Sequence, residues 1–182
     1  HNHSKRKNGN FIALNCAAIP ESLLESELFG HEKGSFTGAT SRRLGKFEEA
    51  SGGTLLLDEV SEMAPQLQAK LLRAIQEREI TRIGSNEAIR VDVRIIATSN
   101  RNLEESVKKG EFREDLYFRL NVVNIRLPAL RERPNDIAPL SQFFADKYAE
   151  ANGVAKKLLS AESALKMKSY TWRGNIRELE NT

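Results

Sequence analysis

The stretch Gly52-Gly53-Thr54-Leu55-Leu56-Leu57-Asp58-Glu59 decides how the rest of the chain is interpreted. It joins a glycine pair, which is typical of a turn, to an uninterrupted apolar run and two adjacent carboxylates. An apolar run of this length after a turn signal predicts a parallel strand that is buried on both faces. Ligands of open α/β sheets bind beyond the carboxyl ends of such strands. The two acids are therefore expected at the edge of the sheet where a ligand would bind.

Two carboxylates at a strand end can divide the work of nucleotide hydrolysis. Asp58 can hold a hydrated Mg²⁺ while Glu59 orients an attacking water. The pattern resembles a Walker B element, and the alternative is a buried strand that ends in two solvated acids. Short motifs often match by chance, so the pattern alone leaves both interpretations open.

The composition is that of an ordinary globular protein. Of the 182 residues, 40% are hydrophobic and 29% are charged, which suits one core with a small second lobe. No apolar stretch approaches the roughly 20 residues of a membrane span, and there is no secretory signal. The single cysteine, Cys16, excludes an internal disulfide and favours a cytoplasmic protein without membrane attachment. A net charge of +3 is too small to indicate nucleic-acid binding.

Hydrophobic patterns predict strands that alternate with helices in the first part of the chain. Strands are expected at 11–16, 54–59, 94–98 and 122–127, helices at 20–29, 64–77, 103–109 and 111–120, and a hairpin or loop at 80–93. Such alternation implies a parallel sheet with right-handed crossovers. Only helical patterns follow, at 137–151, 161–170 and from 176 onward. The expected architecture is an α/β core over residues 1–133 and a small all-α domain over residues 134–182.

The segment Gly34-Ser35-Phe36-Thr37-Gly38-Ala39 predicts a flexible loop with an aromatic tip. A phenylalanine in this polar, glycine-flanked setting either packs locally or is left for a partner. The residue types alone slightly favour local packing.

Five segments together resemble one family over essentially the whole chain. They are ESELFGHEKGSFTGA, GGTLLLDEV, FREDLYFRLN, LPALRERPNDI and WRGNIRELEN. They are similar to the central AAA+ ATPase domain of bacterial sigma-54-dependent transcriptional activators. GSFTGA is the most specific of them, because other AAA+ proteins lack this loop. The resemblance implies a P-loop NTPase-type parallel sheet with a helical lid, ATP and Mg²⁺ as cofactors, and ATP hydrolysis coupled to the remodelling of sigma-54 RNA polymerase for promoter opening.

The resemblance also implies roles for polar residues at the strand ends. Asp58 would support Mg²⁺ through water, Glu59 would polarise the attacking water, and Asn15 would be a switch residue that pairs with Glu59. The alternative for Asn15 is an amide that caps a turn. Thr98 and Asn100 would sense the γ-phosphate, and their alternative, helix N-capping, stays open for Asn100.

Three arginines match family positions that act on the nucleotide. Arg113 and Arg119 would reach the nucleotide of a neighbouring subunit, and Arg177 would reach back from the helical domain to the phosphates. Ordinary surface ion pairing is the alternative for any one of them. A trans arginine requires self-association into a ring, a hexamer or heptamer in the family.

The same resemblance makes Gly34–Ala39 the contact with sigma-54, with Phe36 and Thr37 touching the sigma factor. This reverses the preference for local packing of Phe36. The region 84–88 would be a companion loop that shares the motion. DNA would be bound only through a helix-turn-helix domain that this chain lacks.

The sequence departs from the family pattern in one central way. It contains no GxxxxGK(S/T) phosphate-binding loop, so the core is expected to be truncated at its N-terminus and the chain alone is predicted not to turn over ATP. The strand expected between 94–98 and 122–127 would be missing with it. Ser35 in place of the usual alanine and Arg173 in place of the usual proline are lesser departures.

Two other functions remain open. A clamp-loader-like AAA+ ATPase would share the acidic strand end, although the GSFTGA loop argues against it. A non-catalytic interaction fragment is kept open by the absent phosphate-binding loop.

Overall fold

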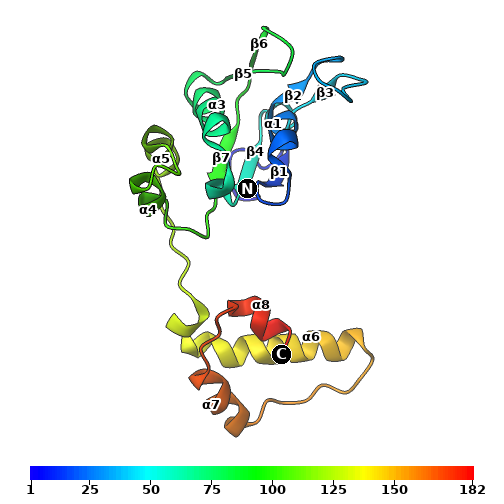
Figure 1. The fold of residues 1–182 in the computed structure, drawn as a ribbon. Coiled ribbons are helices and arrows are strands. Elements are labelled where there is room, and N and C mark those ends of the chain that lie inside the picture. The colour runs from blue at the N-terminus through cyan, green and yellow to red at the C-terminus, as the bar shows by residue number, and fades with distance from the viewer. The chain divides into compact units, whose positions relative to one another are not determined.

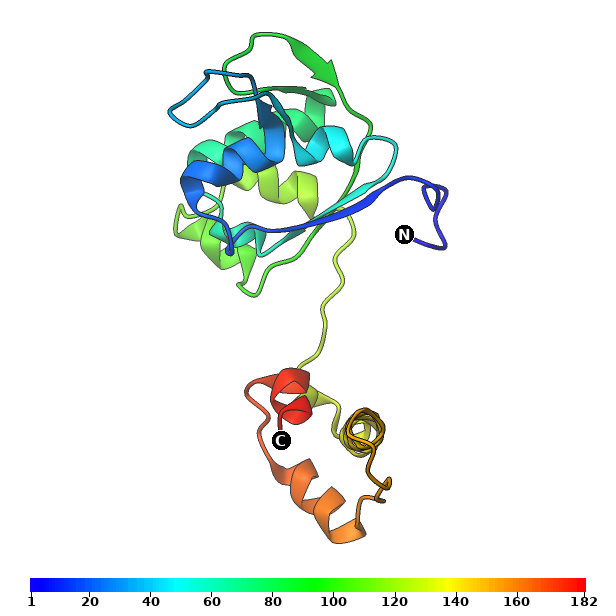
Figure 2. The ribbon, with the colours of Figure 1, turned by 90° about the vertical axis from the view of Figure 1, so that its right-hand side faces the viewer.

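The computed structural model describes residues 1–182 as two compact units, His1–Asn124 and Ile125–Thr182 (Figures 1 and 2). Each unit has an apolar core of its own. The first contains every strand, and the second contains only helices and 3-10 turns.

A three-stranded parallel sheet forms the centre of the first unit. Strand β4 (Thr54–Asp58) lies between β1 (Phe11–Asn15) and β7 (Arg94–Ala97). The side chains of Leu55 and Leu57 are fully buried. The predicted α/β fold is thus confirmed, because a strand paired on both edges and covered on both faces needs an uninterrupted apolar run.

Helices of the first unit begin and end at residues that suit helix termini. They are α1 (Glu21–Phe29), α2 (Lys46–Glu49), α3 (Pro65–Glu77), α4 (Leu103–Lys108) and α5 (Glu114–Leu120). Pro65 opens α3, since a proline at the first position sacrifices no helical hydrogen bond. Asn102 caps α4 by accepting from the backbone N–H groups of Glu104 and Glu105. Helix α3 buries Leu67 and Leu71 in the core, as its apolar spacing predicts.

Two short antiparallel ribbons lie together at one end of this unit (Figures 1 and 2). One pairs β2 (Gly30–His31) with β3 (Arg43–Leu44), and the other pairs β5 (Glu79–Thr81) with β6 (Ala88–Arg90). A parallel bridge between His31 and Ile83 connects them. The ribbons therefore bring the loop at 34–39 beside the loop at 82–87.

The second unit consists of η2 (Leu130–Glu132), η3 (Pro134–Asp136), α6 (Ile137–Ala151), α7 (Ala161–Ser169) and α8 (Asn175–Glu180). Its core is formed by four buried side chains, those of Leu130, Ile137, Trp172 and Leu179. The Trp172 indole donates to the carbonyl of Met167 at 2.8 Å, which satisfies the polar end of the buried ring. The predicted helical region is confirmed.

The predicted strand at 122–127 is wrong. These residues form no helix or strand, and their apolar side chains are 77–85% exposed, those of Val122, Val123, Ile125 and Leu127. The parallel sheet has the order β1-β4-β7, and none of its strands pairs with this segment. An apolar pattern makes a strand only where a neighbour can satisfy its backbone N–H and C=O groups.

Candidate functional site

Three adjacent strand ends converge on the carboxylate of Asp58. The Asn15 amide nitrogen donates to Asp58 Oδ2 at 3.0 Å, and the Thr98 hydroxyl donates to Asp58 Oδ1. The register explains this meeting, because Asn15 is the direct partner of Asp58 in the β1–β4 ladder and Thr98 directly follows β7. Sequence reasoning placed all of these residues at one edge, and the structure brings them into contact.

Asn15 both caps a turn and contacts the acidic site. Its Oδ1 accepts from the backbone N–H groups of Ala17 and Ala18 at 2.9 and 3.0 Å, and this turns the amide nitrogen toward Asp58. The predicted pairing of Asn15 with Glu59 is wrong in this structure. Glu59 lies one residue beyond the ladder, whereas the residue in register with Asn15 is Asp58.

Glu59 has a left-handed backbone, with φ 57° and ψ 48°, which is uncommon for a residue other than glycine. Its N–H donates to the Thr98 hydroxyl at 3.3 Å, and the N–H of Val60 donates to the Thr98 carbonyl at 2.9 Å. Such a conformation costs about 1–3 kcal/mol and persists only where neighbouring contacts hold it. It turns the chain from β4 into η1 (Val60–Glu62), so Glu59 leaves the line of the strand.

The Glu59 carboxylate accepts a hydrogen bond from the Asn100 amide at 3.3 Å. Asn100 does not cap the following helix, because Asn102 is the N-cap of α4. The alternative of helix N-capping is therefore wrong for Asn100. Asp58 and Glu59 are thus each held by amide or hydroxyl donors from neighbouring strand ends.

The donor set suits a divalent cation held through water. Each Asp58 oxygen accepts one hydrogen bond from the protein, which leaves lone pairs on both oxygens for further donors. Mg²⁺ keeps most of its waters and takes one or two carboxylates together with phosphate oxygens. No group of three or more histidine, cysteine, aspartate or glutamate side chains could enclose a metal. The half-buried Asp58 carboxylate fits such a hydrated ion.

Cys16 lies beside this site and its thiol is buried. Burial raises the pKa of its thiol to about 12, and the negative charges of Asp58 and Glu59 act in the same direction. The thiolate is the reactive form of cysteine, so the thiol stays protonated and unreactive at neutral pH. Cys16 thus behaves as a small buried apolar residue.

The three predicted arginines are exposed, and none of them forms a hydrogen bond or an ion pair with Asp58 or Glu59. Arg113 precedes α5 and pairs with Asp115 at 2.6 and 3.0 Å; these hydrogen bonds raise the pKa of Arg113 and lower that of Asp115. Exposed pairs of this kind contribute little stability, so the guanidinium can exchange partners. Arg119 is exposed in the last turn of α5, and Arg177 is exposed on α8 of the second unit.

The loop from Gly34 to Ala39 is closed by a hydrogen bond of 2.8 Å from the Gly34 N–H to the Ala39 carbonyl. Phe36 is 38% exposed and its ring meets the edge of His31 at a centroid distance of 5.0 Å. The ring therefore packs locally against His31 and is still partly exposed, and its contact with a partner stays a prediction.

The neighbouring loop around Gly84 is in direct contact with this loop. The Glu32 N–H donates to the Ile83 carbonyl at 3.0 Å, and Ile83 in turn donates to the Gly30 carbonyl at 3.0 Å. A Cβ atom on Gly84 would come within 2.5 Å of the Ser35 Cβ. The two loops are therefore in physical contact, and the shared motion predicted for them stays a prediction.

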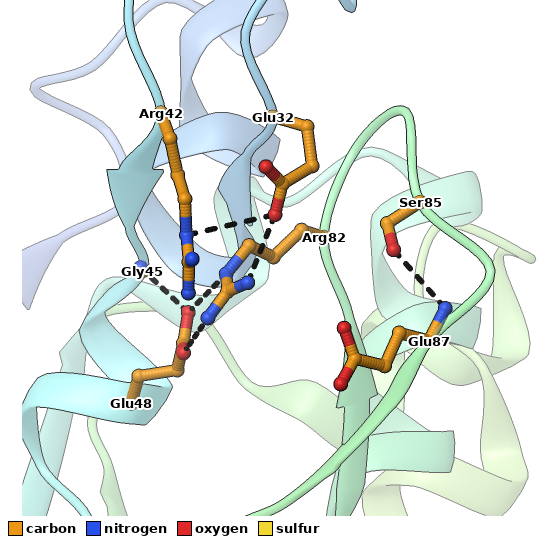
Figure 3. Close-up of polar contacts among 7 residues, drawn as sticks. All are labelled: Glu32, Arg42, Gly45, Glu48, Arg82, Ser85 and Glu87. Atoms are coloured by element: carbon orange, nitrogen blue, oxygen red, sulfur yellow. Dashed lines mark hydrogen bonds and ion pairs between the residues drawn. The ribbon is translucent and has the colours of Figure 1, made fainter.

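A buried ion-pair cluster fastens the two ribbons together (Figure 3). The Arg82 side chain is only 6% exposed and donates to Glu48 through Nε at 2.9 Å and through Nη2, and to Glu32 through Nη1 at 2.9 Å. These hydrogen bonds, those to Glu48 first, hold the pKa of the Arg82 guanidinium above its ordinary value despite its burial. Sequence reasoning missed this cluster, for which the one signal was an arginine placed between Ile80 and Ile83.

Replacing Arg82 by methionine is expected to lower the free energy of unfolding by about 3 kcal/mol. The change leaves the Glu48 carboxylate without its counter-charge, whereas Glu32, at 32% exposure, keeps its ion pair with Arg42 at 3.6 Å and is partly hydrated. Urea unfolding of the 182-residue chain measures the loss. The control is Arg78→Met, since the Arg78 side chain is 77% exposed, and its effect should stay within about 0.5 kcal/mol. A loss below 1 kcal/mol for Arg82→Met would contradict a structural role for the cluster.

Comparison with known families identifies the chain. The model of the sigma-54 interaction domain matches residues 1–126. The chain belongs to the sigma-54 interaction domain family. The model of the AAA+ ATPase lid domain matches residues 131–182. The two matches follow the division of the fold into an α/β unit and a helical unit.

Curated relatives of this sigma-54 interaction domain are regulatory proteins. The chain is 64% identical over 181 residues to the transcriptional regulatory protein FlbD of Caulobacter vibrioides, and spans 40% of that protein. It is 58% identical over 182 residues to the Nif-specific regulatory protein of Azospirillum brasilense, and spans 29% of it. All of this chain is covered in both cases, so it corresponds to less than half of either relative.

Solved structures of other proteins have a similar fold. NtrX from Brucella abortus, solved in complex with ATP, has a TM-score of 0.90 and 39% identity, with 100% of this chain and 39% of that chain covered. A structure of NtrX in complex with ADP is equally similar. Hsp104 of S. cerevisiae, at TM-score 0.67 and 19% identity over 94% of this chain and 33% of its own, shares the fold. None of the helices combines the length and the apolar character needed to cross a bilayer.

Proposed function

We propose that this sigma-54 interaction domain is the ATP-hydrolysing part of a longer transcriptional activator, and that hydrolysis remodels sigma-54 RNA polymerase for promoter opening. The observation that carries the proposal is the convergence of Asn15 and Thr98 on Asp58, with Glu59 held by Asn100 beside it. The names of the relatives, which are transcriptional regulators, and the NtrX complexes with ADP and ATP support it.

The residues of the strand ends divide the chemistry. Asp58 would hold Mg²⁺ through water, and the ion would supply charge neutralisation on the phosphates. Glu59 accepts the proton of the attacking water, and Asn100 keeps its carboxylate in place. Thr98 fixes both acids at once, because its hydroxyl donates to Asp58 and accepts from the Glu59 N–H.

The remaining phosphate-binding groups come from outside this chain. No GxxxxGK(S/T) loop occurs among the 182 residues, so the longer protein supplies the backbone amides and lysine that cradle the phosphates. Arg113 and Arg119 are exposed, which suits a role at the nucleotide of a neighbouring subunit in a ring. In this assignment Arg177 on α8 is the lid residue for the phosphates, and the core and lid are residues 1–133 and 134–182, whereas the compact units of the structure divide after Asn124.

The loop Gly34-Ser35-Phe36-Thr37-Gly38-Ala39 is the contact with sigma-54 in this proposal. Phe36 is the exposed apolar side chain that the partner covers, and the ion pair of Arg82 with Glu32 holds the chain two residues before the loop. A clamp-loader-like ATPase has no use for this loop. A non-catalytic interaction fragment would keep the loop contact but would lack nucleotide-dependent binding.

Replacing Phe36 by alanine in the longer protein is expected to abolish promoter opening while ATP turnover changes less than twofold. The change removes the exposed ring and leaves the acidic site untouched. Pull-down of sigma-54 and permanganate footprinting of the promoter measure the loss.

The matched control is Phe143→Ala on α6, an exposed phenylalanine of the second unit at 60% exposure, which should leave both readouts unchanged. Promoter opening by the Phe36→Ala protein at the wild-type level would disprove the loop assignment. ATP-independent binding of sigma-54 would favour the interaction fragment instead.

A further inference from the structure

Gln68 is a polar side chain in the apolar face of α3. It is fully buried, and its neighbours on the same helix are Leu67, Leu71 and Leu72. A buried amide at such a position is costly unless all its polar atoms are hydrogen-bonded.

Every polar atom of the Gln68 amide is engaged by backbone. Nε2 donates to the carbonyl of Met63 at 2.8 Å and to the carbonyl of Glu111 at 3.0 Å. Oε1 accepts from the N–H of Arg113 at 2.8 Å. The two carbonyls fix which end of the amide is the donor, so the oxygen faces the Arg113 N–H without ambiguity.

These three backbone groups belong to two separate segments, the turn after Glu59 and the segment before α5. Met63 closes the 3-10 turn that starts directly after Glu59. Glu111 and Arg113, which are 43 and 45 residues from Gln68 in sequence, lead into α5. No side chain caps α5, so the Arg113 N–H has Gln68 as its partner in place of a local cap. The Gln68 amide thus connects the turn that follows Glu59 to the segment that carries Arg113.

We propose that Gln68 is a positioning residue that sets where Arg113 stands relative to Glu59 of the same subunit. The inference rests on the proposed trans role of Arg113. A shift of the turn behind Glu59 moves the Met63 carbonyl, and Gln68 passes this shift to the Arg113 backbone. The nucleotide site of one subunit thereby controls the arginine that this subunit offers to its neighbour.

The first experiment tests the link in the 182-residue chain. Gln68→Met keeps the length and apolar stem of the side chain but makes none of the three hydrogen bonds. Hydrogen exchange of the Arg113 amide is expected to accelerate by about tenfold or more, because its buried acceptor is gone. The control is Gln76→Met, an exposed position of the same helix, which should leave that amide unchanged. An unchanged Arg113 amide in folded Gln68→Met would overturn the link.

The second experiment separates positioning from a merely structural role in mixed rings of the longer protein. Turnover of Gln68→Met alone is expected to fall by about tenfold or more. Mixing it with Glu59→Gln subunits, which keep a well-placed Arg113, should restore turnover. Mixing it with Arg113→Ala subunits should restore none, because neither partner offers a placed arginine. Damage to the subunit's own acids would give the reverse pattern and would overturn the proposal.

Two further measurements distinguish failure of the trans role of Arg113 from failure of the role proposed for Gln68. If Arg113→Ala mixed with Glu59→Gln shows no restoration, the trans role in the proposed function fails, whatever Gln68 does. Should Gln68→Met not fold, Gln68→Glu replaces it, since the neutral acid keeps an oxygen for the Arg113 N–H and has one O–H donor for only one of the two carbonyls of Met63 and Glu111. Full activity of rings built from folded Gln68→Glu would then overturn the coupling.

Discussion

A longer protein that carries Glu59→Gln in this domain is expected to bind ATP normally and to hydrolyse it at least about 100-fold more slowly than the wild type. Glutamine has the size of glutamate and keeps an oxygen that can accept from the Asn100 amide, so the geometry of the strand end persists. It cannot take up the proton of the attacking water. Binding and turnover should therefore separate in this variant.

Calorimetric titration with ATP and a phosphate-release assay measure the two quantities. The control is Glu62→Gln, because Glu62 lies three residues on and its carboxylate pairs with Arg101 at 2.9 Å instead of with Asn100. Turnover of Glu59→Gln within twofold of the wild type would show that Glu59 is not the base.

Replacing Arg113 by alanine is expected to lower turnover of a homogeneous ring by about 10³-fold, the usual magnitude for an arginine supplied in trans. The side chain is exposed, and its contact with Asp115 is a surface ion pair, so its loss should leave the fold intact. Arg119→Ala is expected to behave in the same way. The acids of the mutated subunit remain competent.

Mixed rings test this division of labour. Arg113→Ala subunits supply intact acids and Glu59→Gln subunits supply an intact arginine, so mixing two inactive proteins should regain activity at the interfaces that combine them. Arg73→Ala, an exposed arginine of α3 paired with Glu77, should be fully active alone and serves as the control. Mixtures as inactive as their components would contradict a trans arginine.

The centre of the fold and the meeting of the site residues could be predicted because both depend on local pattern and on a rule of topology. Parallel strands end at a common edge, so polar residues at the carboxyl ends of β1, β4 and β7 had to meet. The partner of Asn15 could not be predicted, because it depends on the register of β1 against β4, and a shift by one residue changes every pair.

Other features of the structure could not be predicted from the hydrophobic pattern of the sequence. Strands β2 and β3 have two residues each, too few to show alternation. The segment 122–127 showed a strand-like pattern and still formed none, since pairing depends on a neighbour that the pattern does not reveal. Gln68 and Arg82 looked like ordinary polar residues, although a polar residue at a core-facing position of a helix or ribbon is the signal that could have marked both.

The fit of Ser35 against Gly84 makes these two positions interdependent. Gly84 has φ +81° and no room for a methyl group, while the Ser35 hydroxyl is enclosed without a hydrogen-bond partner. A bulkier residue at either site would wedge the ribbon tips apart, so each site tolerates variation only while the other stays small. The two loops are far apart in the chain, and the space between them limits the side-chain size at both positions.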